Sequence, residues 1–177
     1  MKAYTSNNIR NIAVLGHGGK GKTTLCEAML YIAGASDRLG RVADGNTVLD
    51  FDSEEKRRKS SVSSAMAALE WDNTKLNIID APGLFDFEGG AAEAVRAAEA
   101  VLIVTSAGSG VDVGTEKAFR AADKKGAAKF FAVTKTDSDH RNFYKTFDAL
   151  KEVYGNKLCP TIIPYMEGNI TKCYVNL

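Results

Sequence analysis

The stretch from residue 11 to residue 24 constrains the fold of this chain more than any other. A short apolar run is followed by a glycine-rich loop, and helix-forming sequence begins at Leu25. The loop matches the spacing G-x-x-x-x-G-K-[ST] in full, with Gly16, Gly21, Lys22 and Thr23 at the defining positions. Glycines let successive backbone N–H groups converge on phosphate oxygens, and the following helix adds unpaired amides and the positive end of its dipole. The pattern therefore predicts a strand, a phosphate-binding loop (P-loop) and a helix.

This loop supplies the first group of candidate site residues. Lys22 is expected to reach the β- and γ-phosphates of a nucleotide, and the Thr23 hydroxyl is expected to ligate Mg²⁺. The alternative is a glycine-rich turn between strand and helix that binds no ligand; the complete pattern and both flanking elements argue against it. The nucleotide-binding residues expected from the loop are His17, Gly18, Gly19, Lys20, Gly21, Lys22, Thr23 and Thr24.

Apolar runs and helical patterns alternate along the rest of the chain. The chain has 177 residues, which suffices for one domain with a sizeable core. The alternation predicts a three-layer α/β P-loop domain with a mostly parallel central sheet. Strands are expected at 11–15, 65–71, 76–80, 100–105 and 129–134, and helices at about 22–34, 89–99, 114–125 and 139–154.

Composition narrows the function classes. The net charge of +1 gives no global sign of nucleic-acid binding, so sequence-specific DNA is not an expected partner. Cys26, Cys159 and Cys173 lack metal-ligand spacing and suggest a reducing compartment. No apolar run approaches membrane-spanning length, and the N-terminus lacks the apolar stretch of a signal peptide. We therefore expect a cytoplasmic protein with no membrane partner.

Residues 35–63 interrupt the alternation. The segment is polar, includes the charge run from Glu54 to Lys59, and contains nothing that we expect to bury against a core. A loop of this length inside a compact domain is usually functional or disordered. Two interpretations are open: a switch that becomes ordered around the γ-phosphate and Mg²⁺, or a solvated surface insertion. The basic residues at 56–59 could likewise contact RNA phosphates or form a solvated face.

A second motif, D-x-x-G, closes the strand expected at 76–80. Asp80 ends this strand, and Gly83 follows three residues later. The carboxylate can hold Mg²⁺ through water, and the glycine N–H can contact the γ-phosphate. The motif is weak alone because Asp and Gly are common in turns. Behind a complete P-loop, it predicts a loop that senses nucleotide hydrolysis.

A third motif follows the apolar run at 130–133. A carboxylate at Asp137 can accept both N–H donors on the Watson–Crick edge of guanine, while the stem of Lys135 covers the purine face. Adenine presents an acceptor where guanine presents N1–H, so Asp137 is expected to select guanine. A surface Lys and Asp without a ligand is the alternative. GTPases usually carry Asn at the position of Thr134, and threonine is expected to weaken the loop bracing and the base contact.

Taken together, four segments resemble a translational GTPase, above all the G domain of elongation factor G and its elongation-factor-G-like branch. They are Gly-His-Gly-Gly-Lys-Gly-Lys-Thr-Thr at 16–24, Thr-Val-Leu-Asp-Phe-Asp at 47–52, Asp-Ala-Pro-Gly-Leu-Phe-Asp-Phe at 80–87 and Gly-Val-Asp-Val-Gly-Thr-Glu at 110–116. The resemblance runs from the first strand to the C-terminus. It implies GTP and GDP as ligands, hydrolysis with Lys22 and Gly83 as catalytic residues, Mg²⁺, and the ribosome as partner. It makes 35–63 switch I and adds Ser61 to Thr23 and Asp80 as a metal-binding residue.

Two positions depart from the elongation factors. Leu84 stands where they carry the histidine that positions the attacking water, and an aliphatic side chain cannot hydrogen-bond water. The elongation-factor-G-like branch also lacks that histidine. Gly19 stands where elongation factor G has a P-loop aspartate. Nucleotide binding is therefore a firmer expectation than fast turnover, and a GTP-dependent regulatory or ribosome-protection switch with weak hydrolysis is the alternative.

The resemblance also implies domain limits. The family carries a later Ser-Ala-Lys or Ser-Ala-Leu loop that bonds the guanine oxygen, and nothing after Asp137 fits it. We therefore expect residues 1–158 to form the core of the G domain, truncated before its last sheet strand. Residues 159–177 are expected to begin an inserted subdomain and to be an incomplete part of it.

One rival comes from another class of nucleotide-binding protein. ATPases of the partition-protein (ParA/MinD-like) and nitrogenase-iron-protein class have the similar loop K-G-G-x-G-K-T-T. Their first lysine reaches a partner's phosphate, and this chain has the shorter His17 there. Together with the guanine motif at 134–137, this makes the ATPase the less favoured interpretation. His17 and His140 lack the neighbours of a metal site and are interpreted as ordinary loop residues.

Overall fold

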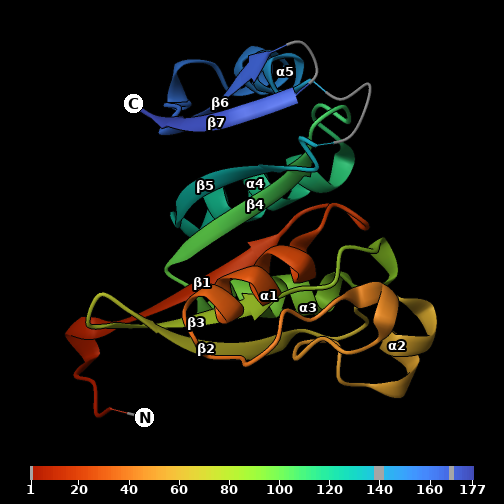
Figure 1. Cartoon of the computed structure of the whole chain (residues 1–177), viewed down its shortest axis with the longest axis vertical. Helices are drawn as coiled ribbons and strands as arrows, with labels where there is room; N and C mark the ends of the chain where they lie inside the picture. The colour runs from red at the N-terminus through yellow and green to blue at the C-terminus, as the bar shows by residue number, and fades with distance from the viewer. Residues whose placement is uncertain (1, 138–141, 168–169) are drawn as a thin grey trace.

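A five-stranded sheet with helices on both faces forms the body of the molecule. The computed structural model describes residues 2–137, 142–167 and 170–177. The strand order is β2-β3-β1-β4-β5 (Figure 1). Along the chain the strands are β1 (Ile9–Leu15), β2 (Ala65–Trp71), β3 (Thr74–Asp80), β4 (Ala100–Ser106) and β5 (Ala128–Thr134). All five predicted strands are confirmed, with bounds that differ by no more than two residues.

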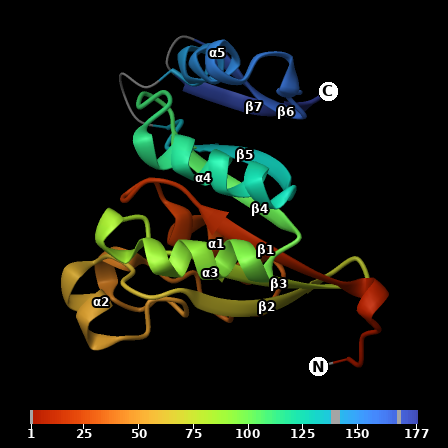
Figure 2. The same ribbon diagram turned by 180° about the vertical axis from the view of Figure 1, so that it is seen from behind.

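The helices divide between the two faces of this sheet. Helix α1 (Lys22–Ile32) packs through Cys26 and Leu30 on one face, whereas α3 (Glu88–Ala97) and α4 (Val113–Lys125) pack through small residues such as Ala94 and Ala118 on the other. Figure 1 shows α1 in front of the sheet, and Figure 2, seen from behind, shows α3 and α4 in front. The predicted three-layer α/β architecture is therefore confirmed.

The direction of the strands decides where the loops meet. Strands β1, β3, β4 and β5 pair in parallel, so their carboxyl ends lie along one edge of the sheet, at the right of Figure 1. Strand β2 alone runs antiparallel to β3. The two are joined by a tight turn at Asp72 and Asn73, which both have positive φ, of 43° and 56°. The loops after four strands are thereby gathered at a single site.

The segment at 35–63 differs from our expectation. Leu49 is 1% exposed and belongs to the core cluster that contains Cys26 and Leu30, so the expectation that this segment contributes nothing to the core is wrong. The buried carboxylate of Glu27 accepts hydrogen bonds from the backbone N–H groups of Val48, at 2.7 Å, and Leu49, at 3.2 Å. A single buried leucine in a polar stretch leaves no periodicity in the sequence, which is why the pattern missed it.

The same segment contains a short helix, α2 (Ser53–Arg58), that we did not expect. Asp52 begins it with a capping box, since its side chain accepts from Glu54 N at 2.7 Å and the Glu55 carboxylate accepts from Asp52 N at 3.3 Å. Glu55 is buried and also accepts from the N–H groups of Val62 and Ser63, at 2.9 and 3.1 Å. The Glu55 carboxylate therefore holds the end of the segment, at 62–63, against helix α2.

The C-terminal part forms a second, smaller sheet. Helix α5 (Phe143–Tyr154) is followed by β6 (Ile162–Glu167) and β7 (Ile170–Asn176), which pair antiparallel and join no strand of the large sheet. The Tyr144 hydroxyl on α5 donates to the carbonyl of Pro164 at 2.8 Å, which ties the hairpin to the helix (top of Figure 1). The helix expected at 139–154 is confirmed from Phe143 onward; residues 138–141 lie outside the described part.

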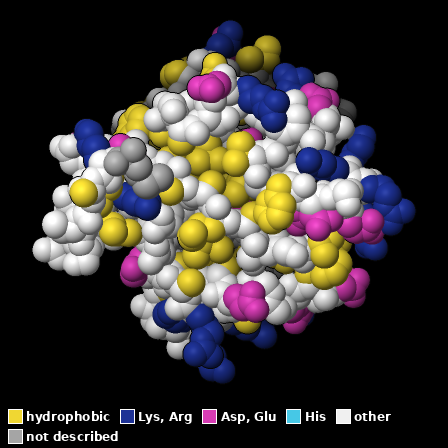
Figure 3. Space-filling view, turned by 90° about the horizontal axis from the view of Figure 1, so that it is seen from below, with side chains coloured by type: hydrophobic (Ala, Val, Ile, Leu, Met, Phe, Trp, Pro, Cys, Tyr) yellow, Lys and Arg dark blue, Asp and Glu magenta, His cyan; other side chains and the backbone are white. Residues whose placement is uncertain are grey.

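Strand β2 is the edge strand at the end of the large sheet away from β5. Met66 and Trp71 on β2 are 68% and 56% exposed. Figure 3 views the molecule from the side of β2 and shows apolar side chains near the middle of the face, with charged groups around them. Among the described residues, no helix has the length and apolar character needed to cross a membrane.

Replacing Leu49 tests whether residues 35–63 belong to the core. Leu49→Ala should lower the free energy of unfolding by about 2–4 kcal/mol, because it leaves a cavity beside Cys26 and Leu30. The neighbouring Val48→Ala, at a side chain that is 47% exposed, should cost under about 1 kcal/mol. Urea unfolding followed by circular dichroism measures both, and equal small losses would contradict the packing.

Candidate functional site

The loop between β1 and α1 curls tightly at the centre of this edge. Gly16 has φ of +139°, and a Cβ there would collide with the carbonyl of Val104 on β4. Gly21, with φ of +86°, precedes α1, and its carbonyl accepts from Leu25 N at 2.9 Å in the first helical turn. A glycine is therefore required at 16 because the sheet lies directly against the loop, and the loop leads its backbone amides into the helix N-terminus.

Lys22 places its ammonium inside the loop. Nζ donates to the carbonyls of Gly16 and His17, both at 3.0 Å, and the residue is 6% exposed. Burial lowers the pKa of this lysine, and the nearby Asp80 opposes that effect. A buried cation whose hydrogen bonds go only to carbonyls can exchange them for stronger charge-assisted bonds to an anion.

Next to the phosphate-binding loop, hydroxyl and carboxylate oxygens come together from α1, the 35–63 segment and the end of β3. Thr23 Oγ1 donates to Asp80 Oδ2 at 2.6 Å. Ser61 Oγ lies 3.2 Å from Thr23 Oγ1 and donates to Asp50 Oδ1 at 2.7 Å. The structure therefore brings together Thr23, Ser61 and Asp80, the three residues expected to bind metal. It adds Asp50, which lies in the family-like segment at 47–52 but which we did not assign to the site from the sequence.

The oxygens of this cluster fit a hard divalent cation. Asp80 Oδ1 and Asp50 Oδ2 are buried without a hydrogen-bond partner among the described residues. Burial raises the pKa of Asp80 to about 7 although the Thr23 bond and Lys22 oppose it, and burial also raises the pKa of Asp50. The described residues include no group of three or more His, Cys, Asp or Glu that could hold a metal. Mg²⁺ suits such a site, because it keeps several waters and takes one or two carboxylates together with phosphate oxygens.

The loop after β3 closes against the phosphate-binding loop. A Cβ on Gly83 would lie 2.8 Å from both Gly16 O and Gly18 N and would collide with Nζ of Lys22, so no other residue fits there. The next side chain, Leu84, is 39% exposed and comes within contact of Gly18. The side chain of Leu84 has no hydrogen-bonding group to offer beside the phosphate-binding loop.

A cleft of about 210 Å³ joins these parts. Its walls include Lys22, Gly83 and Lys135, the last from the loop after β5. Asp50, Lys59 and Ser61 line it from the 35–63 segment. Of the expected nucleotide-binding residues, Gly19, Gly21, Thr23 and Thr24 line the cleft as well.

The loop after β5 is tied to the phosphate-binding loop by two side chains. Thr134 Oγ1 lies 2.6 Å from Lys20 O and 3.0 Å from Thr105 O, so its one proton serves either carbonyl. Lys135, with φ of +56°, donates from Nζ to Gly19 O at 2.6 Å. We expected threonine at 134 to weaken the contact between this loop and the phosphate-binding loop, but the Thr134 hydroxyl does make that contact. Asp137 is exposed at the end of this loop, and His140 lies outside the described residues.

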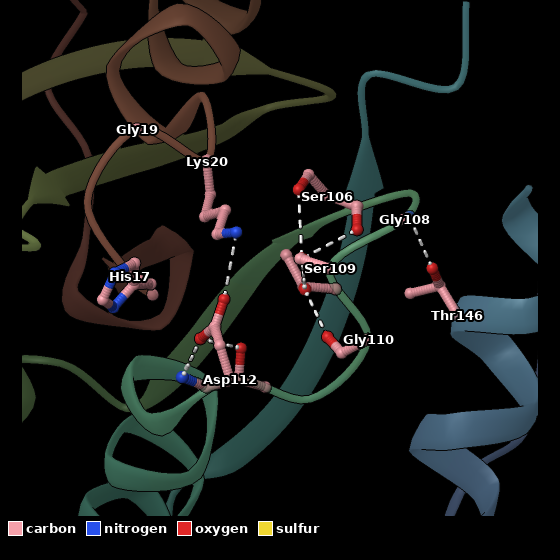
Figure 4. A network of polar contacts seen from close by, with 12 residues as sticks. His17, Gly19, Lys20, Ser106, Gly108, Ser109, Gly110, Asp112 and Thr146 are labelled. Carbon is pink, nitrogen blue, oxygen red and sulfur yellow. Dashed lines mark hydrogen bonds and ion pairs between the residues drawn. The ribbon is translucent and has the colours of Figure 1, made fainter. Parts of the chain in front are cut away.

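A second brace was not foreseen from the sequence. Lys20 forms an ion pair with Asp112 at 3.2 Å, and both side chains are less than one-fifth exposed (Figure 4). Asp112 begins α4, where Oδ1 accepts from Thr115 N and Thr115 Oγ1, each at 2.9 Å. Burial disfavours the Asp112 carboxylate, but these bonds and Lys20 hold its pKa below the usual value. The capping pattern D-x-x-T at 112–115 was the available signal.

Neighbouring contacts fix the remaining residues of this region. His17 lies apart from the Lys20–Asp112 pair in Figure 4 and packs edge-on against Phe85, with ring centres 5.4 Å apart. Gly108 N donates to Thr146 Oγ1 at 3.0 Å, which attaches the loop after β4 to α5. The His17 side chain therefore supports the loop after β3, and only its backbone faces Lys22.

Comparison with known proteins gives consistent results. Residues 7–172 match the family model described as the elongation factor Tu GTP binding domain. The elongation factor G-like protein of Mycobacterium tuberculosis H37Rv is 37% identical over 92% of this chain, and elongation factor G of Granulibacter bethesdensis is 33% identical over 93%. A crystal structure of a protein from Thermus thermophilus superposes with a TM-score of 0.89 at 38% identity, covering 95% of this chain. The chain spans 23–25% of the length of these three proteins.

Removing the Thr134 hydroxyl tests the first brace. Thr134→Val keeps the shape but leaves the Lys20 and Thr105 carbonyls without this donor, and should lower the free energy of unfolding by about 1–2 kcal/mol. Thr134→Ser retains the hydroxyl and should recover most of that loss. Chemical denaturation of the three proteins measures the difference; a valine variant as stable as the unaltered chain would contradict the role of the hydrogen bond.

Proposed function

The chain belongs to the family of elongation factor Tu GTP-binding domains, and we propose that its cleft binds GTP and GDP together with Mg²⁺ and hydrolyses GTP. The observation that carries this proposal is the convergence of Thr23, Ser61 and Asp80, from three distant segments, beside Lys22 and Gly83. Buried carboxylate oxygens that lack partners among the described residues are complementary to a cation. The buried ammonium of Lys22 is complementary to a polyphosphate.

The proposed roles follow from the positions of the groups. Lys22 and Gly83 act on the β- and γ-phosphates, through the ammonium and the backbone N–H respectively. The phosphates lie against His17, Gly18, Gly19, Lys20, Gly21 and Thr24, and the base lies against Thr134, Lys135 and Asp137. Thr23, Ser61 and Asp80 hold the metal, with Asp50 as an additional oxygen ligand. Mg²⁺ neutralises phosphate charge when bound, while the residues of this chain orient the nucleotide around it.

Guanine rather than adenine is the proposed base. Lys135 and Thr134 anchor the loop that carries Asp137 to the phosphate-binding loop, so an exposed carboxylate is held at a set distance from the phosphates. The ATPase of the partition class is disfavoured, because His17 packs on Phe85 and offers no ammonium to a partner's phosphate.

In the whole protein, we propose that this domain serves translation elongation on the ribosome, in the cytoplasm. Residues 1–158 are the proposed nucleotide-binding core, with 35–63 as switch I, and 159–177 belong to an inserted subdomain. The separate β6–β7 sheet supports this division. The link from Asp50 to Ser61 supports the switch, because ordering the segment completes the metal site.

A second candidate function rests on Leu84. Its aliphatic side chain stands beside Gly18 and Gly83, where no group of its own can hold a water molecule. This favours a GTP-dependent regulatory or ribosome-protection switch in which bound nucleotide, rather than fast turnover, carries the signal.

Base selection is tested by comparing GDP and ADP binding in the presence of Mg²⁺. The chain should prefer GDP, and Asp137→Asn should weaken GDP binding by roughly 10- to 100-fold, because hydrogen bonds to a charged group are lost. Asp148→Asn, the same charge change at an exposed position on α5, should leave both affinities unchanged. Equal or tighter ADP binding by the unaltered chain would favour the ATPase.

The consequence of Leu84 is tested by single-turnover hydrolysis of bound GTP. Leu84→Ala should leave the slow rate within about twofold, whereas Leu84→His should raise it roughly tenfold or more by supplying a group that can hold water. Addition of ribosomes separates the two candidate functions: steep acceleration of the unaltered chain would contradict the weak-hydrolysis switch.

A further inference from the structure

The turn that ends α2 has an unusual backbone. Four non-glycine residues in the described ranges have positive φ. Asp72 and Asn73 form the tight turn between β2 and β3, whose geometry requires it. The other two are lysines, Lys59 with φ of 53° and Lys135 with φ of 56°, and both line the 210 Å³ cleft.

A left-handed conformation is costly for lysine. It disfavours a residue with a Cβ by roughly 1–2 kcal/mol, and glycine is the usual choice where a helix ends this way. Lys59 N nevertheless donates to Glu55 O in this cap. A lysine in a conformation that favours glycine points to a use for its side chain.

Lys59 differs from the two arginines before it in its ionic contacts. Arg57 and Arg58, on the exposed face of α2, both form ion pairs with Glu54. Within the part of the chain that the structure describes, Lys59 has no ion pair. It precedes Ser61 by two residues, and the Ser61 hydroxyl is 3.2 Å from that of Thr23. Lys56 also lacks an ion pair among the described residues, but only Lys59 of this basic run lines the cleft, together with Ser61.

We propose that Lys59 is a phosphate-binding residue of this cleft and that its ammonium recognises the terminal phosphate of a nucleoside triphosphate. This inference rests on the proposed function, since it requires that the cleft holds a guanine nucleotide. A lysine has a flexible four-carbon stem and a compact charge, which suits a group that must reach a phosphate across an open cleft. The third phosphate adds negative charge at the end near Ser61, so Lys59 favours the triphosphate over the diphosphate.

The test uses the chain as it is, with Mg²⁺, GDP and the slowly hydrolysed analogue GTPγS. Lys59→Gly removes the ammonium and relieves the left-handed backbone, so the fold should be retained or stabilised. It should weaken GTPγS binding by roughly tenfold, as for one lost charged contact, and leave GDP binding within about twofold. Lys59→Arg should retain most of the preference for GTPγS. Arg57→Gln, which removes a cation that does not line the cleft, should change neither affinity.

Each result has a defined meaning. If Lys59→Gly and the unaltered chain bind GTPγS equally well, or if GDP and GTPγS weaken by the same factor, Lys59 does not recognise the terminal phosphate and the inference is overturned alone. If the unaltered chain binds neither nucleotide, the proposed function fails, and the inference falls with it before any variant is compared.

Discussion

The rest of the structure depends on charge buried where β1 and β3 end. Lys22 is 6% exposed and lies near the carboxylates of Asp80 and Asp50, and Glu27 adds a further charge near Asp80; the three acids are at most 3% exposed. Buried charges are destabilising unless they are paired or hydrogen-bonded. Each of these groups has at least one firm contact, yet one carboxylate oxygen on each acid lacks a partner among the described residues. On the proposed function, a bound cation and a bound anion would together supply partners to the groups that face the cleft.

The segment at 35–63 is held by carboxylates as much as by apolar contact. Glu27 accepts from the backbone at 48–49 and Glu55 from the backbone at 62–63, while Leu49 is the one fully buried apolar side chain of the segment. A segment that rests on a few polar anchors has a smaller opening free energy than one that buries a full face. The segment also places Asp50 and Ser61 beside Thr23 and Asp80. On the proposed function, bound nucleotide and the order of this segment would therefore support each other.

On the other side, the phosphate-binding loop is held by side-chain hydrogen bonds and an ion pair. Thr134 and Lys135 contact the carbonyls of Lys20 and Gly19, and Lys20 itself pairs with Asp112 at the beginning of α4. The loop is therefore fixed between two elements that follow β4 and β5. On the proposed function, we expect ligand binding to change mainly the 35–63 segment, because it has fewer anchoring contacts than this side of the loop.

The sequence alone determined the five strands of the large sheet, the P-loop and the order of the three motifs, because these depend on residue types at short, fixed spacings; it did not reveal the short helix α2. The parallel pairing that follows from alternating strands and helices also made the meeting of Thr23, Asp80 and Thr134 predictable. Beyond Ser61 and Lys135, which the family resemblance and the guanine motif supplied, only the tertiary structure decided which residues of the irregular segments lie at that site. Leu49, Asp50, Asp112 and Lys59 act through partners many positions away or through a backbone angle, and neither leaves a periodic trace in the sequence.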